Sequence, residues 1–165
     1  MKTSRTLSLG SISTSTLRME DLLPTLLDEL SALRLTRAER ATVRDIRKRM
    51  DAAEQVEPEV GEREPLDYFE TDDAEDDYET LCDIANDHTP DYCYFGSHED
   101  DGADIGVWPV EDLFLSGNRD GGYDGHIGHT RDQRTYPYAL EVNDHGNATL
   151  YRRAGRRWIE VWSIV

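Results

Sequence analysis

The chain has 165 residues, and its 35 acidic against 18 basic side chains give a formal net charge of −17 at pH 7. With 37% hydrophobic residues it can form one domain of ordinary size, or one small core with mobile attachments. No stretch approaches the ~20 consecutive apolar residues of a membrane-spanning helix. The acidic balance argues against direct, sequence-independent binding to nucleic acid, because phosphate binding requires a basic surface.

The N-terminal residues do not have the pattern of a secretory signal, and the two cysteines indicate a protein of a reducing compartment. Residues 1–16 are rich in Ser and Thr and lack the apolar core of about 7–15 residues that a secretory signal carries. The sequence leaves open whether they form an edge strand or a loose arm. Cys82 and Cys93 are expected to be two buried free thiols, with a single disulfide as the alternative. We therefore expect a cytoplasmic protein.

The negative charge is concentrated in the middle of the chain. Residues 1–50 carry a net charge of +4, residues 51–124 of −23, and residues 125–165 of +2. Like charges that are crowded together repel and lower stability. We therefore expect the acidic block to have a function that offsets this loss of stability, either solubility or the binding of a basic partner.

Two helices are predicted in the first third of the chain. Six leucines between positions 22 and 33 follow the spacing of one apolar face, which predicts a helix over residues 19–35 whose regular part begins near Pro24. Thr36 and Glu39 form a capping box, which predicts a second helix from residue 36 to about 54. The two helices form a helical hairpin. In the second helix the buried stripe is Val43, Ile46, Met50 and Ala53, and the basic stripe is Arg37, Arg40, Arg44, Arg47 and Lys48.

The acidic middle divides into a linker and a helix. Residues 55–66 combine Pro, Gly and four glutamates, which predicts a solvated linker. Residues 67–87 have helical periodicity and predict a docked amphipathic helix. Its apolar stripe is Ala74, Tyr78, Leu81 and Ala85, and Asp72, Asp76, Glu79 and Asp83 line the opposite side.

The remaining sequence predicts β-structure. Short strands are expected at residues 92–95 and 105–108, around an acidic turn, and a glycine-rich loop at residues 117–132. Strands at 138–142, 148–152 and 157–165 form a meander, and the last strand is expected to be central because both of its faces are apolar. The fold class is α+β, with an N-terminal helical hairpin, an acidic helix and a C-terminal antiparallel sheet. The expected organisation is a hairpin with an N-terminal arm (1–54), an acidic linker (55–66) and the acidic helix with the sheet (67–165), together one compact domain.

The strongest candidate site is the acidic surface. Carboxylates three or four residues apart on a helix lie about 5–6 Å from each other, close to the spacing of successive phosphates on one nucleic-acid strand. Such a surface imitates a phosphate backbone for a basic groove. The alternative is a solvated face that confers solubility. The predicted partner-binding residues are Asp72, Asp73, Asp76, Asp77, Glu79, Asp83, Glu99, Asp100, Asp101 and Asp104.

Other candidate sites are weaker. The basic helix, Arg37 to Arg49, suits a major groove, but pairing with the acidic segment of the same chain or simple solvation is the preferred interpretation. His126 and His129, with Asp124 and Asp132, have spacings that suit zinc, in a glycine-rich context that does not preorganise them. Neither loop 99–104 nor loop 120–125 fits the twelve-residue calcium pattern. The aromatic residues are expected mainly in the core. No catalytic motif is present, so we expect neither an enzyme nor a metal or other cofactor.

Three segments resemble a family of small, acidic, uncharacterised proteins encoded on bacterial and phage genomes. They are TLRMEDLLPTLLDELSAL at 16–33, YFGSHEDDGADIGVW at 94–108 and VNDHGNATLYRR at 142–153. The resemblance covers about half of the chain, and it implies no activity, because none is assigned to that family. By charge and size the chain also resembles the phosphate-mimicking inhibitors that phages and plasmids use against restriction and CRISPR enzymes.

The sequence thus predicts a non-enzymatic DNA mimic, an anti-CRISPR or anti-restriction phage protein that evades host defence. Its partner would be a basic nucleic-acid-binding protein, a CRISPR effector or a restriction-type nuclease, whose nucleic-acid site it blocks. One alternative is an immunity protein or antitoxin that neutralises a cognate basic toxin. Another is a transcriptional regulator that uses the helical hairpin. The leucine-rich helix also leaves a homodimer possible.

Overall fold

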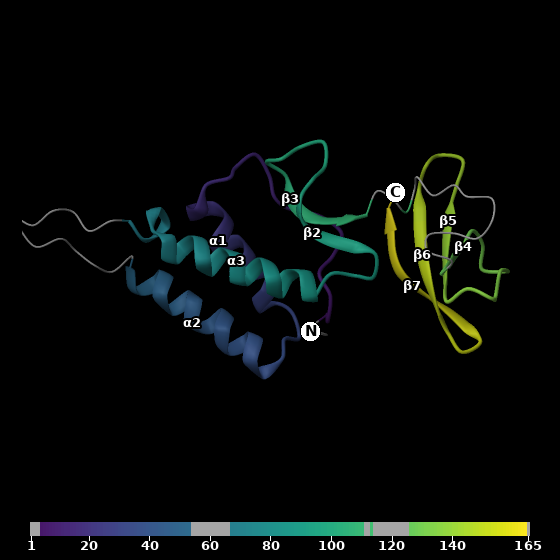
Figure 1. Cartoon of the computed structure of the whole chain (residues 1–165), viewed down its shortest axis with the longest axis horizontal. Coiled ribbons are helices and arrows are strands. Elements are labelled where there is room, and N and C mark those ends of the chain that lie inside the picture. Colours follow the sequence, from purple (N-terminus) through teal and green to yellow (C-terminus); the bar gives the residue numbers. More distant parts are fainter. Residues whose placement is uncertain (1–3, 54–66, 111–112, 114–125, 165) are drawn as a thin grey trace, which may run out of the picture. The chain divides into compact units, whose positions relative to one another are not determined.

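The computed structural model describes residues 4–53, 67–110, 113 and 126–164, which form two compact units (Figure 1). The first unit contains the chain up to residue 89 together with residues 94–108. The second contains residues 90–93 and the chain from residue 109 onward. The fold class is α+β, as the sequence predicts, with the helices in the first unit and a mostly antiparallel sheet in the second. The predicted linker at residues 55–66 lies outside the described residues.

Helix α1, Met19–Ser31, supplies the centre of the first unit. Leu23, Leu27 and Leu30 are completely buried, and α1 contacts both other helices and strand β1, Gly10–Ser13. The helix starts before Pro24 and not at it. In its first turn the Thr16 hydroxyl donates a hydrogen bond to Asp21 Oδ2 at 2.8 Å. It ends four residues earlier than expected. The leucine face is therefore used inside this unit.

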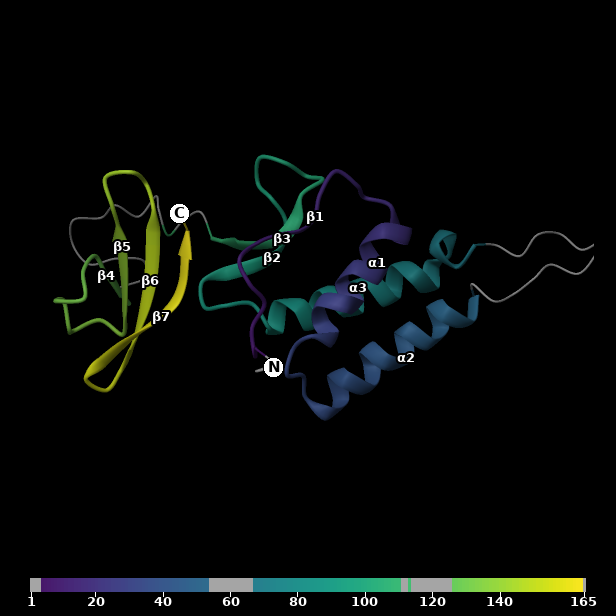
Figure 2. The same ribbon diagram turned by 180° about the vertical axis from the view of Figure 1, so that it is seen from behind.

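Helix α2, Arg37–Ala53, begins at the predicted capping box. The Thr36 amide donates to Glu39 Oε2 at 2.7 Å, and the Glu39 amide donates to Thr36 Oγ1 at 3.2 Å. This reciprocal pair satisfies two amides that have no partner inside the helix. Val43, Ile46 and Met50 are buried and Ala53 is half-buried, so the predicted apolar stripe is confirmed. Helix α2 contacts both α1 and α3 (Figure 2).

Helix α3, Asp72–Asp87, is the predicted acidic helix. A short 3₁₀ turn, η1, Tyr68–Glu70, precedes it, so the α-helix starts five residues later than the periodicity suggests. The side chain of Asp67 accepts a hydrogen bond from the Phe69 amide and begins that turn. Ala74, Leu81 and Ala85 are buried and Tyr78 is half-buried, which places the apolar stripe of α3 against α1.

The first unit is completed by a three-stranded sheet of order β1-β3-β2, where β2 is Cys93–Ser97 and β3 is Ile105–Pro109. Strand β1 answers the question that the sequence leaves open for the N-terminal residues: Gly10–Ser13 is an edge strand, antiparallel to β3. Gly106 permits this pairing, since a side-chain carbon there would overlap the carbonyl group of Gly10.

The second unit is a four-stranded sheet of order β4-β5-β6-β7. Its strands are β4, Ile127–Gly128, β5, Tyr138–Val142, β6, Ala148–Ala154, and β7, Arg157–Ile164. The meander is confirmed, but two details were wrong. Strand β4 lies inside the predicted loop 117–132 and pairs in parallel with β5. Among the described strands β7 lies at the edge of the sheet, and only Trp162 is buried in it. The Trp162 indole donates to the Asp91 carbonyl oxygen at 3.0 Å.

Candidate acidic interaction surface

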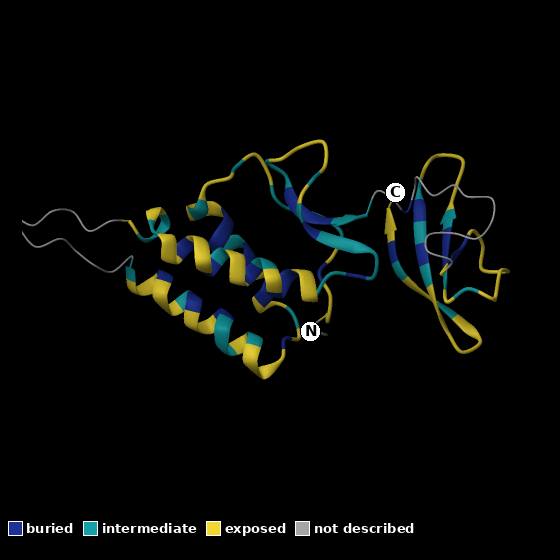
Figure 3. Cartoon of the chain, in the orientation of Figure 1, coloured by how far each residue is buried: buried dark blue, intermediate teal, exposed yellow. Residues whose placement is uncertain are grey.

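One face of α3 is covered with carboxylates and contains no cation. Seven carboxylates are exposed along the helix, whose exposed positions are yellow in Figure 3, and α3 has no Lys or Arg. Within the described part of the chain, none of the seven forms a side-chain hydrogen bond or an ion pair. We call this set the acidic face; it contains Asp72, Asp73, Glu75, Asp76, Glu79, Asp83 and Asp87. Glu75 and Asp87 were not among the predicted residues, although they lie on the polar side of the same helical period.

The charge density of the acidic face is that of a nucleic-acid strand. Helix α3 has sixteen residues, which corresponds to about 24 Å at 1.5 Å per residue. Seven charges over that length average about one per 3.4 Å, the axial spacing of phosphates along one strand of a duplex. The helix thus presents a rigid row of anions, and a row of this kind fits a cationic groove.

Asp77 is a correction to the predicted site. It is 7% exposed, in contrast to its neighbours on the acidic face. The guanidinium group of Arg49 from α2 donates to both of its carboxylate oxygens, and the Tyr68 hydroxyl donates to Oδ2 at 2.6 Å. Burial alone would raise the pKa of Asp77, but these hydrogen bonds outweigh it and hold that pKa below its usual value. Asp77 therefore connects α2 to α3 inside the fold and is not available to a partner.

The loop between β2 and β3 forms a second, separate acidic group. Glu99, Asp100 and Asp101 are exposed, whereas Asp104 is half-buried and accepts a hydrogen bond from Ser11 Oγ at 3.0 Å. Both ribbon views show this loop apart from α3 (Figures 1 and 2). The structure thus keeps four of the predicted residues away from the acidic face, and Asp104 belongs partly to the contact between β1 and β3.

The carboxylates at the two ends of α3 differ in their effect on the helix. Asp72, Asp73 and Glu75 lie in the first turn, where the helix dipole favours negative charge. Asp83 lies near the other end, where the dipole disfavours it, and it has like-charged neighbours four residues away on both sides, Glu79 and Asp87. The acidic face is therefore kept at a cost to helix stability toward its C-terminal end.

We expect Asp83→Asn to raise the free energy of unfolding by about 0.5 kcal/mol, because it removes two like-charge pairs and an unfavourable dipole interaction. Asp72→Asn is the matched control, since it removes one exposed charge from the same face at the favourable end, and it should lower stability slightly. Urea denaturation followed by circular dichroism measures both changes. Equal effects of the two variants would contradict this description of α3.

The basic helix is engaged within its own unit. Arg47 donates to Asp28 Oδ1 of α1 at 2.7 Å, and Arg49 pairs with Asp77. Arg40 donates to the Leu35 carbonyl oxygen at 2.9 Å. Among the described residues, these contacts favour the interpretation in which arginines of α2 pair with groups of the same chain.

The described residues give little support to a metal site or to a reactive cysteine. No group of three His, Cys, Asp or Glu side chains there is arranged to hold a metal ion. Asp124 of the predicted zinc set and the loop 120–125 lie outside those residues. Cys82 and Cys93 are half-buried. Burial raises the pKa of Cys82 to about 11 and that of Cys93 to about 12, so both are weak nucleophiles at neutral pH.

Comparison with known proteins gives no assignment. No family model matches the chain, and the comparisons with curated proteins and with solved structures found no match. None of the helices in the described part of the chain is long and apolar enough to cross a membrane.

Proposed function

We propose that this protein is a non-enzymatic inhibitor that binds a basic nucleic-acid-binding protein and blocks its nucleic-acid site by phosphate mimicry. The observation that carries the proposal is the acidic face: seven exposed carboxylates on one helix, without a counter-ion among the described residues. A CRISPR effector or a restriction-type nuclease is the class of partner that presents a cationic groove of matching charge spacing. Such enzymes work in the cytoplasm, where cysteine thiols stay reduced.

Solubility alone does not explain how the charges are placed. Soluble proteins intersperse charges of both signs over the surface, and an excess of carboxylates for solubility need not gather on one helix. Here they gather on a single face and extend into the part of α3 where the dipole disfavours them. A specific cationic partner gives that arrangement a function, because opposed potentials speed association and fix orientation.

An immunity protein or antitoxin remains the alternative, because a basic toxin would bind the same face. The gene neighbourhood distinguishes the two, since an adjacent toxin gene favours immunity. The regulator hypothesis is less favoured, because Arg40, Arg47 and Arg49 of α2 contact groups of their own unit.

The test is affinity capture from host lysate with the full chain as bait, at low and at high salt, with bound proteins identified by mass. We expect one basic nucleic-acid-handling protein, retained at low salt, released at high salt and displaced by duplex DNA. The Debye length is about 8–10 Å at physiological ionic strength, and it shortens as salt is added. Added salt therefore weakens the attraction between exposed charges. A partner that duplex DNA does not displace would contradict phosphate mimicry, as would capture that salt does not weaken.

A further inference from the structure

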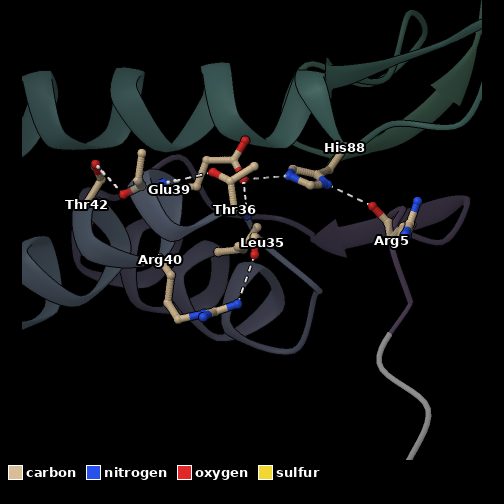
Figure 4. A network of polar contacts seen from close by, with 8 residues as sticks. Arg5, Leu35, Thr36, Glu39, Arg40, Thr42 and His88 are labelled. Atoms are coloured by element: carbon tan, nitrogen blue, oxygen red, sulfur yellow. Dashed lines mark hydrogen bonds and ion pairs between the residues drawn. The ribbon is translucent and has the colours of Figure 1, made fainter.

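The last turn of α3 places a histidine between two hydrogen-bond acceptors. His88 follows Asp87 as the C-cap of α3. Its Nδ1 lies 2.7 Å from the carbonyl oxygen of Arg5, and its Nε2 lies 3.2 Å from Oε2 of Glu39 (Figure 4). A carbonyl oxygen and a carboxylate both accept and cannot donate. Both contacts are therefore hydrogen bonds only when the ring carries two protons, because neutral imidazole has one N–H.

Each acceptor belongs to a different segment of the first unit. Glu39 is part of the capping box of α2, where the same Oε2 accepts the Thr36 amide at 2.7 Å. Arg5 belongs to the segment that leads into β1. This segment is also held by the Leu7 amide, which donates to the His88 carbonyl oxygen at 2.8 Å, and by burial of the Leu7 side chain. His88 thus joins three segments: the end of α3, the start of α2 and the N-terminal segment.

We propose that His88 is a proton-controlled latch, in which the imidazolium ties the N-terminal segment and the α2 capping box to the end of α3, and loss of one proton opens one of the two contacts. After that loss, one ring nitrogen presents a lone pair to an acceptor oxygen, whichever nitrogen keeps its proton. The contact at that nitrogen becomes repulsive. If the nitrogen is Nδ1, the N-terminal segment loses its hydrogen bond at Arg5. If it is Nε2, the end of α3 to which the Leu7 amide is bonded loses its link to Glu39, and the attachment of the N-terminal segment is weakened through that end.

The charges around the ring favour the imidazolium. Glu39 faces it from α2 and Asp87 lies beside it on α3, and both carboxylates raise the pKa of His88. Partial burial by itself lowers the pKa of His88. The hydrogen bond to Arg5 and the interaction with Glu39 outweigh it, so this pKa lies above its usual 6.5. The pKa of Glu39 lies below its usual 4.5, chiefly because the Thr36 amide donates a hydrogen bond to its carboxylate. The interaction with His88 makes a smaller contribution in the same direction.

The two shifts define a pH window for the latch. A raised folded-state pKa means that the contribution of His88 to stability is complete below its unfolded pKa, 6.5, and is lost as pH rises through the folded value. A lowered folded-state pKa means that the contribution of Glu39 is complete above 4.5 and is lost as pH falls through its folded value. The latch is therefore fully closed between these two reference values.

The experiment is an NMR titration of the His88 ring in the full chain, together with hydrogen exchange of the Leu7 amide, corrected for the intrinsic pH dependence of exchange. We expect the His88 midpoint to lie above 6.5. Protection of the Leu7 amide should fall several-fold across the same midpoint. A midpoint at or below the usual value, or Leu7 protection that does not change across it, would overturn the latch. Both readouts use the wild-type chain and do not depend on a variant that folds.

Glu39→Gln is the matched variant, because an amide oxygen still accepts the Thr36 amide and keeps the capping box. It removes the charge that faces Nε2, and we expect the His88 midpoint to fall by about one pH unit. Leu7 protection should then be lost at correspondingly lower pH. If the His88 midpoint stays unchanged in a folded Glu39→Gln chain, the charge of Glu39 does not hold the latch, and the proposal is wrong.

Discussion

Replacement of Asp72, Asp76, Glu79 and Asp83 by Lys should abolish capture of the basic partner while the chain stays folded. All four side chains are exposed and lie on one face of α3. The variant replaces a row of anions by a row of cations, so attraction to a cationic groove becomes repulsion. Close charge pairs at protein interfaces contribute about 1.5–7 kcal/mol each, so we expect affinity to fall by more than about 100-fold.

A charge-matched control separates the acidic face from total charge. Glu29, Asp51, Asp132 and Asp144 are exposed, and no carboxylate of these four forms an ion pair within the described residues. Reversing these four to Lys changes the net charge by the same amount but leaves α3 intact. Capture should persist in this control, and circular dichroism should show both variants folded. Equal loss of capture in both would mean that net charge, and not the acidic face, attracts the partner.

The local features of the fold were predictable because they depend on residues close in sequence. The Thr36–Glu39 capping box is a four-residue pattern, and it begins α2 as expected. The apolar stripe of α3 follows from helical period alone, and the exposed carboxylates opposite it follow from the same period. Most of the candidate site therefore needed no tertiary information.

The remaining features depend on contacts between distant residues. Asp77 has the same side chain as its neighbour Asp76, and only the placement of Arg49, 28 residues earlier, shows that it is buried and paired. Strand β4 has two residues and no periodicity, and it is a strand because β5 pairs with it. His88 was too isolated in sequence to assign, since its partners Arg5 and Glu39 lie 83 and 49 residues away.

In the ion pair between Arg49 and Asp77, removing Arg49 should lower stability much more than removing the charge of Asp77. Arg49→Ala leaves the Asp77 carboxylate, whose side chain is 10% exposed, with the Tyr68 hydroxyl as its remaining hydrogen-bond donor. Removing one member of a buried pair costs about 3–5 kcal/mol, and the partial exposure of this pair places the expected loss near the lower end, at about 3 kcal/mol. Asp77→Asn should cost only about 1 kcal/mol, because the Arg49 side chain is 52% exposed and can turn to water.

Acid should reduce the penalty of Arg49→Ala. Without the guanidinium group, burial raises the pKa of Asp77 and is opposed only by the Tyr68 hydrogen bond. Protonation then removes the buried charge, so the loss of stability should be largest at neutral pH and should shrink as pH falls toward the new pKa. Urea denaturation at several pH values, followed by the helical circular dichroism of the first unit, measures this dependence.

The double variant Arg49→Met/Asp77→Leu completes the test. Replacing a buried ion pair by apolar side chains of similar volume is often close to neutral, so we expect its stability to lie within about 1 kcal/mol of wild type. The acidic face remains intact in this variant, and partner capture should be unchanged. If the double variant is as unstable as Arg49→Ala, the pair contributes more than the removal of an unpaired charge. If capture is lost in a stable double variant, Asp77 belongs to the interaction surface after all.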